Sequence, residues 1–117
     1  MCPIDRNSKE HDFQLLAAAT LDQLDKAIEQ AAQQVDLDVE INRNGGVLEV
    51  EFLDRSKMVI NSQSAMCEIW VAAKAGGFHF RHDAGRGDWF DTRDGTALYA
   101  TVSRLISQQS GMVITLI

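Results

Sequence analysis

The first third of the chain places apolar residues three and four positions apart, the spacing of one face of an α-helix. These residues are Phe13, Ala17, Leu21, Leu24, Ile28 and Ala31. No glycine or proline interrupts the stretch from Ser8 to Gln34. Because Asn7 and Glu10 have the spacing of a capping box, we expect one long amphipathic helix that opens near Ser8. The polar residues 1–7 are predicted to form a disordered N-terminus.

After this helix the apolar residues begin to alternate with polar ones, as in a half-buried β-strand. Leu37, Val39 and Ile41 start the pattern, and it recurs in further segments. The expected strands lie around 37–41, 48–52, 57–61, 66–74, 78–81 and, as a short piece, 89–90. Glycine-rich turns at 44–46 and 76–77 separate some of them. Strands joined by tight turns must be antiparallel neighbours, which predicts a sheet built as a meander.

A second helix is predicted over about residues 96–109, with Asp94 as its N-cap and Gly111 as its stop. Its apolar stripe consists of Leu98, Val102, Leu105 and Ile106. The tail at 112–117 is expected either to add a last strand or to pack between the helices.

The order helix, strands, helix predicts an α+β fold, because the apolar face of the sheet needs a cover that the two helices can supply. We expect a two-layer sandwich: an antiparallel sheet of five to six strands, covered on one face by the N-terminal and C-terminal helices. With 117 residues the chain can build one core, so residues 8–117 are taken as a single domain.

The net charge of the chain limits the kinds of ligand and partner that it is expected to bind. The formal net charge is −6, whereas a protein that binds nucleic acid needs a basic surface. An acidic surface instead suits a cation or a protein with a basic patch. No apolar run is long enough to cross a bilayer and the N-terminus has no apolar signal-peptide core. We therefore expect a cytoplasmic protein without membrane contacts.

The chain has none of the short motifs that usually mark an active site. It contains no Gly-x-Ser-x-Gly, no phosphate-binding glycine loop and no His-Glu-x-x-His. His79 and His82 lie three residues apart on or just past a predicted strand, so they should point to different faces. A histidine metal cage is not expected, although a haem or divalent-ion contact through one of them stays open.

Six carboxylates are concentrated where the first helix ends and the first strand begins. We call them the acidic ridge; they are Asp22, Asp25, Glu29, Asp36, Asp38 and Glu40. The first three recur at helical spacing away from the apolar face. Exposed carboxylates offer the oxygen ligands that hard cations take, which predicts a shallow and weak cation site. An ordinary solvated acidic surface would show the same spacing and is kept as the alternative.

A large aromatic side chain is predicted on the polar face of the sheet. Strand alternation places Trp70 there, and Asn61 and Gln63 belong to the preceding strand. An exposed tryptophan ringed by amides is typical of a protein-binding hot spot. A tryptophan half covered by its neighbours, which only strengthens the sheet, is the other interpretation.

Several segments of the chain, taken in order, resemble the frataxin family in its bacterial branch. The likeness covers nearly the whole chain from about residue 11. The segments are 36–41 (DLDVEI), 45–48 (GGVL), 59–63 (VINSQ), 68–72 (EIWVA), 76–80 (GGFHF) and Trp89 followed by 93–95 (RDG).

The resemblance implies a function. Frataxins bind iron weakly, as Fe²⁺ or Fe³⁺, on an acidic ridge, and they attach to the cysteine desulfurase and the scaffold protein of iron–sulfur cluster assembly, whose rate they modulate. It assigns iron binding here to Asp25, Glu29, Asp36, Asp38 and Glu40, with Asp22 on the same stripe but without a clear match. It assigns partner binding to Asn61, Gln63 and Trp70. We expect a monomer, which iron could assemble into oligomers.

The chain departs from the family pattern in two places. Lys26, Gln30, Ala32 and Gln34 stand where acids are common, which thins the acidic ridge. Ala65 stands where a proline is typical, and Glu68 where a glutamine is typical, which alters the partner surface. Two alternatives to a regulatory binding protein are an iron-oxidising ferroxidase and a haem carrier that uses His79 or His82.

Overall fold

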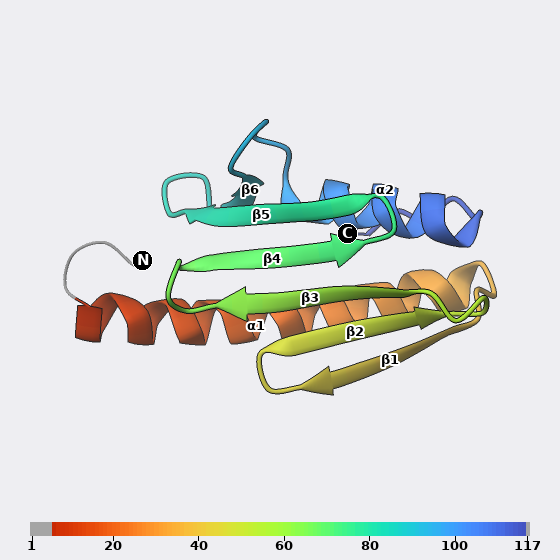
Figure 1. The fold of residues 1–117 in the computed structure, drawn as a ribbon, viewed down its shortest axis with the longest axis horizontal. Helices are drawn as coiled ribbons and strands as arrows, with labels where there is room; N and C mark the ends of the chain where they lie inside the picture. The colour runs from red at the N-terminus through yellow and green to blue at the C-terminus, as the bar shows by residue number, and fades with distance from the viewer. Residues whose placement is uncertain (1–5, 117) are drawn as a thin grey trace.

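The computed structural model describes residues 6–116 (Figure 1). The helices are α1 (Arg6–Gln34) and α2 (Leu98–Ser110). The strands are β1 (Val39–Asn44), β2 (Val47–Phe52), β3 (Lys57–Gln63), β4 (Glu68–Ala73), β5 (Gly76–Asp83) and β6 (Asp88–Asp91). They pair in sequential order as one antiparallel sheet, which confirms the predicted meander.

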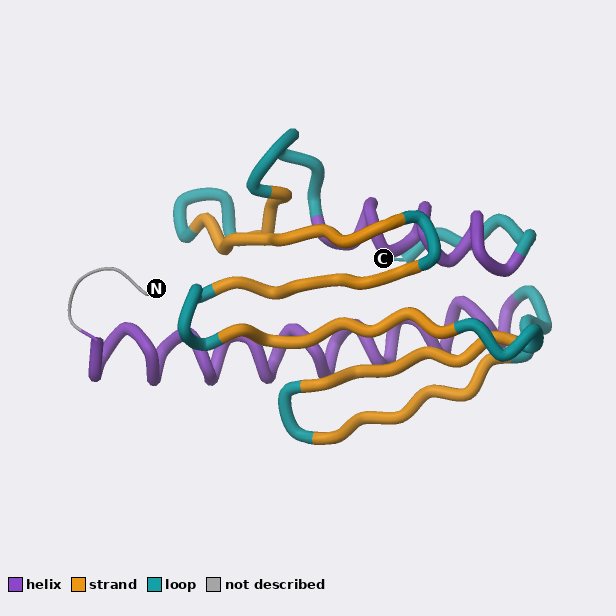
Figure 2. Tube along the Cα trace, in the orientation of Figure 1, coloured by secondary structure: helices purple, strands orange, loops and turns teal. Residues whose placement is uncertain are grey.

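Both helices lie on the same side of the sheet, behind it in the view of Figures 1 and 2. α1 packs on β1, β2 and β3, and α2 packs near β6 at the other end of the strand order. Within residues 6–116, no helix lies on the opposite side of the sheet. The predicted two-layer α+β sandwich, with helices on one face only, is confirmed.

The core lies between the helices and the inner face of the sheet. Strand alternation sends every second side chain inward, as β2 shows by burying Leu48, Val50 and Phe52 while Glu49 and Glu51 stay partly exposed. The helices contribute the apolar stripes expected from the sequence. The buried apolar helix residues are Phe13, Ala17, Leu21, Leu24, Ile28, Ala31 and Ala32 of α1, and Leu98, Val102, Leu105 and Ile106 of α2.

One buried hydrogen bond joins the first helix to the last strand. The Trp89 indole N–H donates to the Thr20 hydroxyl at 2.9 Å, across 69 residues of sequence. The same hydroxyl donates to the Leu16 carbonyl at 2.8 Å. Phe13 and His82 meet the indole edge-on, with ring centroids 5.9 and 5.1 Å away. Trp89 is therefore a core residue whose polar atom is satisfied.

Some predicted boundaries are wrong. α1 already begins at Arg6, so the expected disordered terminus at 1–7 overlaps the helix by two residues, while residues 1–5 lie outside the described range. Nothing at residues 6 and 7 breaks a helix, and Arg favours one. β4 begins only at Glu68, because Cys67 has a positive φ of 53° and belongs to a turn.

The second helix also begins later than expected, at Leu98. The N-cap position is Ala97, whose side chain makes no capping hydrogen bond. Asp94 instead accepts from the Thr96 N–H at 2.9 Å in the preceding turn. Gly111 ends the helix as predicted, with φ of 77° and its N–H donating to the Ser107 carbonyl.

The C-terminal tail is not a strand. It runs back along α2 and buries Ile114 and Leu116. Two serine hydroxyls one helical turn apart fix it: Ser107 accepts from the Ile114 N–H and Ser103 accepts from the Leu116 N–H, both at 2.9 Å. The expected last strand is therefore wrong for residues 113–116, and the hydrogen bonds hold this segment against α2.

The Thr20–Trp89 hydrogen bond can be tested with a double-mutant cycle. Thr20→Val keeps the shape of the side chain but leaves a buried indole N–H without an acceptor, so we expect a loss of about 1–3 kcal/mol in the free energy of unfolding. In a Trp89→Phe background that N–H is absent, and Thr20→Val should cost about 1 kcal/mol less than in the wild type. Urea unfolding of the four proteins measures the coupling. Additive costs would contradict the assignment.

Candidate functional site

The acidic ridge begins on α1, where one carboxylate is already neutralised. Asp22 forms an ion pair with Arg43 of β1, and Arg43 also donates to the Gly45 carbonyl at 2.7 Å. This pair joins the helix to the edge strand. Asp22 is therefore less available to an outside cation than the other members of the ridge.

Asp25 and Glu29 line a hollow of about 490 Å³ between α1 and β1. Its apolar lining is made by Ala32, Leu37, Val39 and Ile41. Gln33 also lines this hollow, whose exposed lining is mainly polar. The two carboxylates are one helical turn apart, so they present negative charge at the border of the sandwich.

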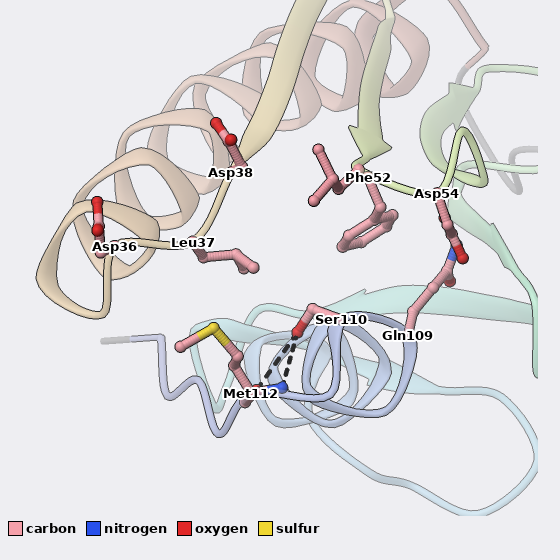
Figure 3. Close-up of a pocket in the computed structure, with 9 residues that line it drawn as sticks. Asp36, Leu37, Asp38, Phe52, Asp54, Gln109, Ser110 and Met112 are labelled. Atoms are coloured by element: carbon pink, nitrogen blue, oxygen red, sulfur yellow. Dashed lines mark hydrogen bonds between the residues drawn. The ribbon is translucent and has the colours of Figure 1, made fainter.

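Asp36 and Asp38 lie at the end of the sandwich, beside a second hollow of about 560 Å³ (Figure 3). Figure 3 shows Leu37, Phe52 and Met112 reaching into this hollow, while the carboxyl groups of Asp36 and Asp38 point away from it. The hollow is thus mainly apolar. Asp36 occupies a tight turn with φ of 55°, a conformation that aspartate tolerates better than most residues.

A third acid at this hollow, Asp54, is engaged elsewhere. Hydrogen bonds from the side chain and backbone of Ser56, together with Lys74 at 3.2 Å, lower the pKa of Asp54 to about 2. It therefore stays ionised and paired, and it does not extend the acidic ridge.

Glu40 completes the ridge on β1. It pairs in register with Glu51 of β2, and Asp38, Glu40 and Glu51 line a third hollow of about 390 Å³. Lys57 of β3 stands opposite Glu51 in the register, and its Nζ lies 3.6 Å from a carboxylate oxygen of Glu49.

The structure thus gathers all six predicted ridge residues along the α1–β1 border. Among the ion pairs formed by the described side chains of residues 11–116, only Asp22–Arg43 involves a ridge member. In the same range no three His, Cys, Asp or Glu side chains converge closely enough to hold a metal ion. This donor set fits a hydrated hard cation held by one or two carboxylates rather than an enclosed cage.

The second candidate surface is the outer face of the sheet. Trp70 is half-buried there, and it forms a row across the strands with Asn61 on one side and His79 on the other. Gln63 stands opposite Glu68 in the neighbouring row. The predicted adjacency of Trp70, Asn61 and Gln63 is therefore confirmed, although their role in binding stays a prediction.

The Trp70 and His79 rings are stacked, with centroids 4.3 Å apart and planes within 9° of parallel. His82 points to the inner face, where it meets Trp89. The two histidines thus face opposite sides of β5, as predicted, and they do not form a joint site for haem or metal.

Glu68 was expected on this face of the sheet, but the contacts that it makes there were not predicted from the sequence. Its side chain is only 5% exposed, although it points to the face without helices. One carboxylate oxygen accepts from the Trp70 indole N–H at 2.8 Å and lies 3.7 Å from His79 Nδ1. The other accepts from Arg81 at 2.6 Å. The opposite charges of Glu68 and Arg81 could have indicated this cluster, but only if the β4–β5 register, which pairs the two residues, were known.

The pKa of Glu68 is set by opposing effects. Burial by itself raises the pKa, but the hydrogen bonds from Trp70 and Arg81, followed by the charges of Arg81 and His79, outweigh burial and lower it below its ordinary value of 4.5. Glu68 is therefore a carboxylate at neutral pH.

Comparison with known proteins identifies this architecture. A frataxin-like domain model matches residues 6–112 of the chain. The chain belongs to the frataxin family. This agrees with the resemblance of its sequence segments.

Relatives of this frataxin match it over nearly their full length. It is 57% identical over 107 residues to the iron-sulfur cluster assembly protein CyaY of Cupriavidus metallidurans, covering 92% of this chain and 95% of that protein. The protein of the same description from Ralstonia nicotianae is 53% identical over 108 residues, covering 92% and 94%.

Solved structures agree on the fold. Frataxin from Psychromonas ingrahamii superposes with a TM-score of 0.73 at 30% identity, over 91% of this chain and 95% of the other. Trimeric frataxin from the yeast Saccharomyces cerevisiae, complexed with ferrous iron, gives a TM-score of 0.68 at 25% identity, over 81% and 85%. Neither helix of the described range is long and apolar enough to span a membrane.

Glu68→Gln tests the charge of the buried carboxylate through pH. Because the folded-state pKa is lowered, the carboxylate stabilises the fold above about pH 4.5, and this contribution is lost as the pH falls through the lowered value. At pH 7 the variant should be less stable than the wild type by roughly 1 kcal/mol. The difference should shrink towards pH 3. Urea unfolding of both proteins at the two pH values checks this, and a difference that does not change with pH would refute it.

Proposed function

We propose that this frataxin is a cytoplasmic iron-binding regulator of iron–sulfur cluster assembly, which docks on a cysteine desulfurase and its scaffold protein. Its near full-length relatives carry the name of iron-sulfur cluster assembly proteins. The observation that supports the mechanism is the acidic ridge: six carboxylates follow one border, and one of them is paired to a base within the described residues.

Iron is the cargo in this proposal and binds weakly at the surface. Carboxylate oxygens suit hydrated Fe²⁺ and Fe³⁺, and an open border lets the ion keep most of its water. Asp25 and Glu29 form one pair of donors, and Asp38 and Glu40 form another at the start of β1. The yeast neighbour that was solved with ferrous iron supports iron as the ligand.

The same ridge also offers the long-range attraction for a basic patch on the desulfurase. The chain has a net charge of −6, and six of its acids lie along this border, so they can steer such a partner and fix its orientation. The outer face of the sheet is left open by the helices, so Trp70, Asn61 and Gln63 can contact the assembly machinery while the ridge is occupied. The protein then acts by binding two partners in a set geometry rather than by chemistry of its own.

The two alternatives have no support of this kind. A ferroxidase centre holds its iron with several enclosed carboxylate and histidine ligands, whereas the ridge is open along its length. A haem carrier would use His79 or His82, but the His79 ring is stacked on Trp70 and the His82 ring packs against Trp89 on the inner face.

Neutralising the ridge tests the electrostatic part of the proposal. The variant Asp25→Asn, Glu29→Gln, Asp36→Asn, Asp38→Asn should bind Fe²⁺ and the desulfurase at least about tenfold more weakly, while its stability is unchanged or higher because like charges no longer repel. Isothermal titration with Fe²⁺ and with the desulfurase measures both affinities.

The matched control compares two pairs of removed charges. Asp25→Asn with Glu29→Gln should weaken both interactions, whereas Asp12→Asn with Asp94→Asn, also exposed but off the ridge, should leave them within about twofold. Asn at position 94 can still accept from the Thr96 N–H. Equal effects of the two pairs would show that net charge, not the ridge, matters.

Replacing the half-buried Trp70 tests the proposed contact through the outer face of the sheet. Trp70→Ala should lower affinity for the desulfurase–scaffold complex by at least about 2 kcal/mol, as expected of an aromatic hot spot. It should also abolish the effect on the rate of cluster formation. Ile69→Ala, which truncates the buried neighbour on the same strand, serves as the stability control and should cost about 2–5 kcal/mol of folding free energy. If Trp70→Ala lowers the melting temperature as much as Ile69→Ala and leaves binding intact, Trp70 is structural.

A further inference from the structure

The outer face of the sheet holds a carboxylate that is nearly removed from solvent. Glu68 is 4% exposed, although no helix covers this side of the sheet. The side chains that cover it are Trp70 on the same strand and His79 and Arg81 on β5, in register with Trp70 and Glu68 respectively. A buried charge on an open face needs partners, and these three residues supply them.

The same contacts restrain the Trp70 indole. Its N–H donates to Glu68 at 2.8 Å, and the face of its ring lies on the His79 imidazole. Glu68 is itself held by Arg81 at 2.6 Å, on the far oxygen of the carboxylate. Arg81 therefore fixes Glu68, and Glu68 fixes the indole. The ring is held at one edge and on one face before any partner arrives.

We propose that Glu68 is a positioning residue for docking: it locks the Trp70 indole in its binding orientation and takes up the indole N–H, so that the partner meets a preset aromatic surface. This rests on the proposed role of Trp70 in partner binding. Holding a side chain in its bound orientation removes the entropy that would otherwise be lost on association. With its N–H already engaged, the indole offers a partner its apolar surface rather than a hydrogen bond.

The flanking charges indicate what kind of partner segment fits. The Arg81 side chain is 61% exposed and His79 is 48% exposed, so both present N–H groups beside the indole. Arginine has five N–H donors, and one of them goes to Glu68. A partner loop with an apolar side chain for the indole, next to a carboxylate or carbonyl oxygen for Arg81, complements this surface.

The test uses the Trp70 indole N–H as its own reporter. In ¹⁵N-labelled protein the two tryptophans give two indole signals, and Trp70→Phe identifies which belongs to Trp70. In Glu68→Ala we expect the Trp70 signal to shift and its hydrogen exchange to accelerate at least about tenfold, because the acceptor is gone. The Trp89 signal, whose acceptor is Thr20, should stay unchanged and so reports that the fold is intact.

Affinity for the desulfurase–scaffold complex is measured on the same proteins. Glu68→Ala should bind about five- to tenfold more weakly, and Glu68→Gln, whose amide oxygen can still accept from the indole, should restore both the Trp70 signal and most of the affinity. Arg81→Gln should give an intermediate effect on both, since it frees Glu68 but keeps the acceptor.

The outcomes separate this inference from the function it rests on. If Trp70→Ala leaves binding intact, the docking role of Trp70 fails, whatever Glu68 does. If Trp70→Ala abolishes binding while Glu68→Ala changes neither the indole signal nor the affinity, docking stands and positioning by Glu68 is overturned. Weaker binding by Glu68→Ala with an unchanged Trp70 signal would also overturn it, because Glu68 would then act by touching the partner itself.

Discussion

The whole arrangement depends on covering one apolar face of a six-stranded sheet. Alternation along each strand makes this face continuous, and burying it against the helices supplies the main favourable term in folding. Both helices are used on that face. On the opposite face, polar side chains can be paired and shielded only by one another. This explains why amides, charged groups and aromatic rings form rows across the strands there. The border of α1 and β1 carries the six acids of the ridge.

The two candidate surfaces follow from this asymmetry and differ in how they are built. The acidic ridge has few contacts among its side chains. Its carboxylates point outward, and one ion pair, Asp22–Arg43, joins α1 to the edge strand. The outer face around Trp70 is tightly connected, with Glu68 at the centre of its contacts. An open acidic border suits ions and partners that exchange quickly, whereas a fixed aromatic surface suits a contact that must be specific.

Most of the fold follows from sequence periodicity. The change from helical to alternating spacing after Gln34 and the glycine turns give the element order, and short connections then leave an antiparallel meander as the simple solution. The ends of the elements are harder to predict, because they depend on single residues. Asp94 has a side chain typical of an N-cap, but it accepts a hydrogen bond from the Thr96 N–H in the turn before the helix. The N-cap position is Ala97, three residues later.

The ridge could be predicted because its members are close in the sequence. The Glu68 cluster could not, since it joins two strands whose relative register decides whether Arg81 or another residue stands opposite Glu68, and a shift by one residue sends every side chain to the other face. The hollow beside Asp36 could not be predicted either, because it arises where the ends of α1, β2 and α2 come together, and the hollow beside Asp25 depends on how β1 packs against α1.

The bond between Thr20 and Trp89 has a consequence for the order of assembly. Each hairpin of the meander, and the α1–β1 border with its acids, closes over short stretches of chain, whereas this contact joins elements at opposite ends of it. Long-range closures are entropically slow and follow local ones. On a growing or refolding chain we therefore expect the acidic border to form before the hydrogen bond between Thr20 and Trp89. The cover of the inner face is complete only once α2, which follows β6, has packed on it.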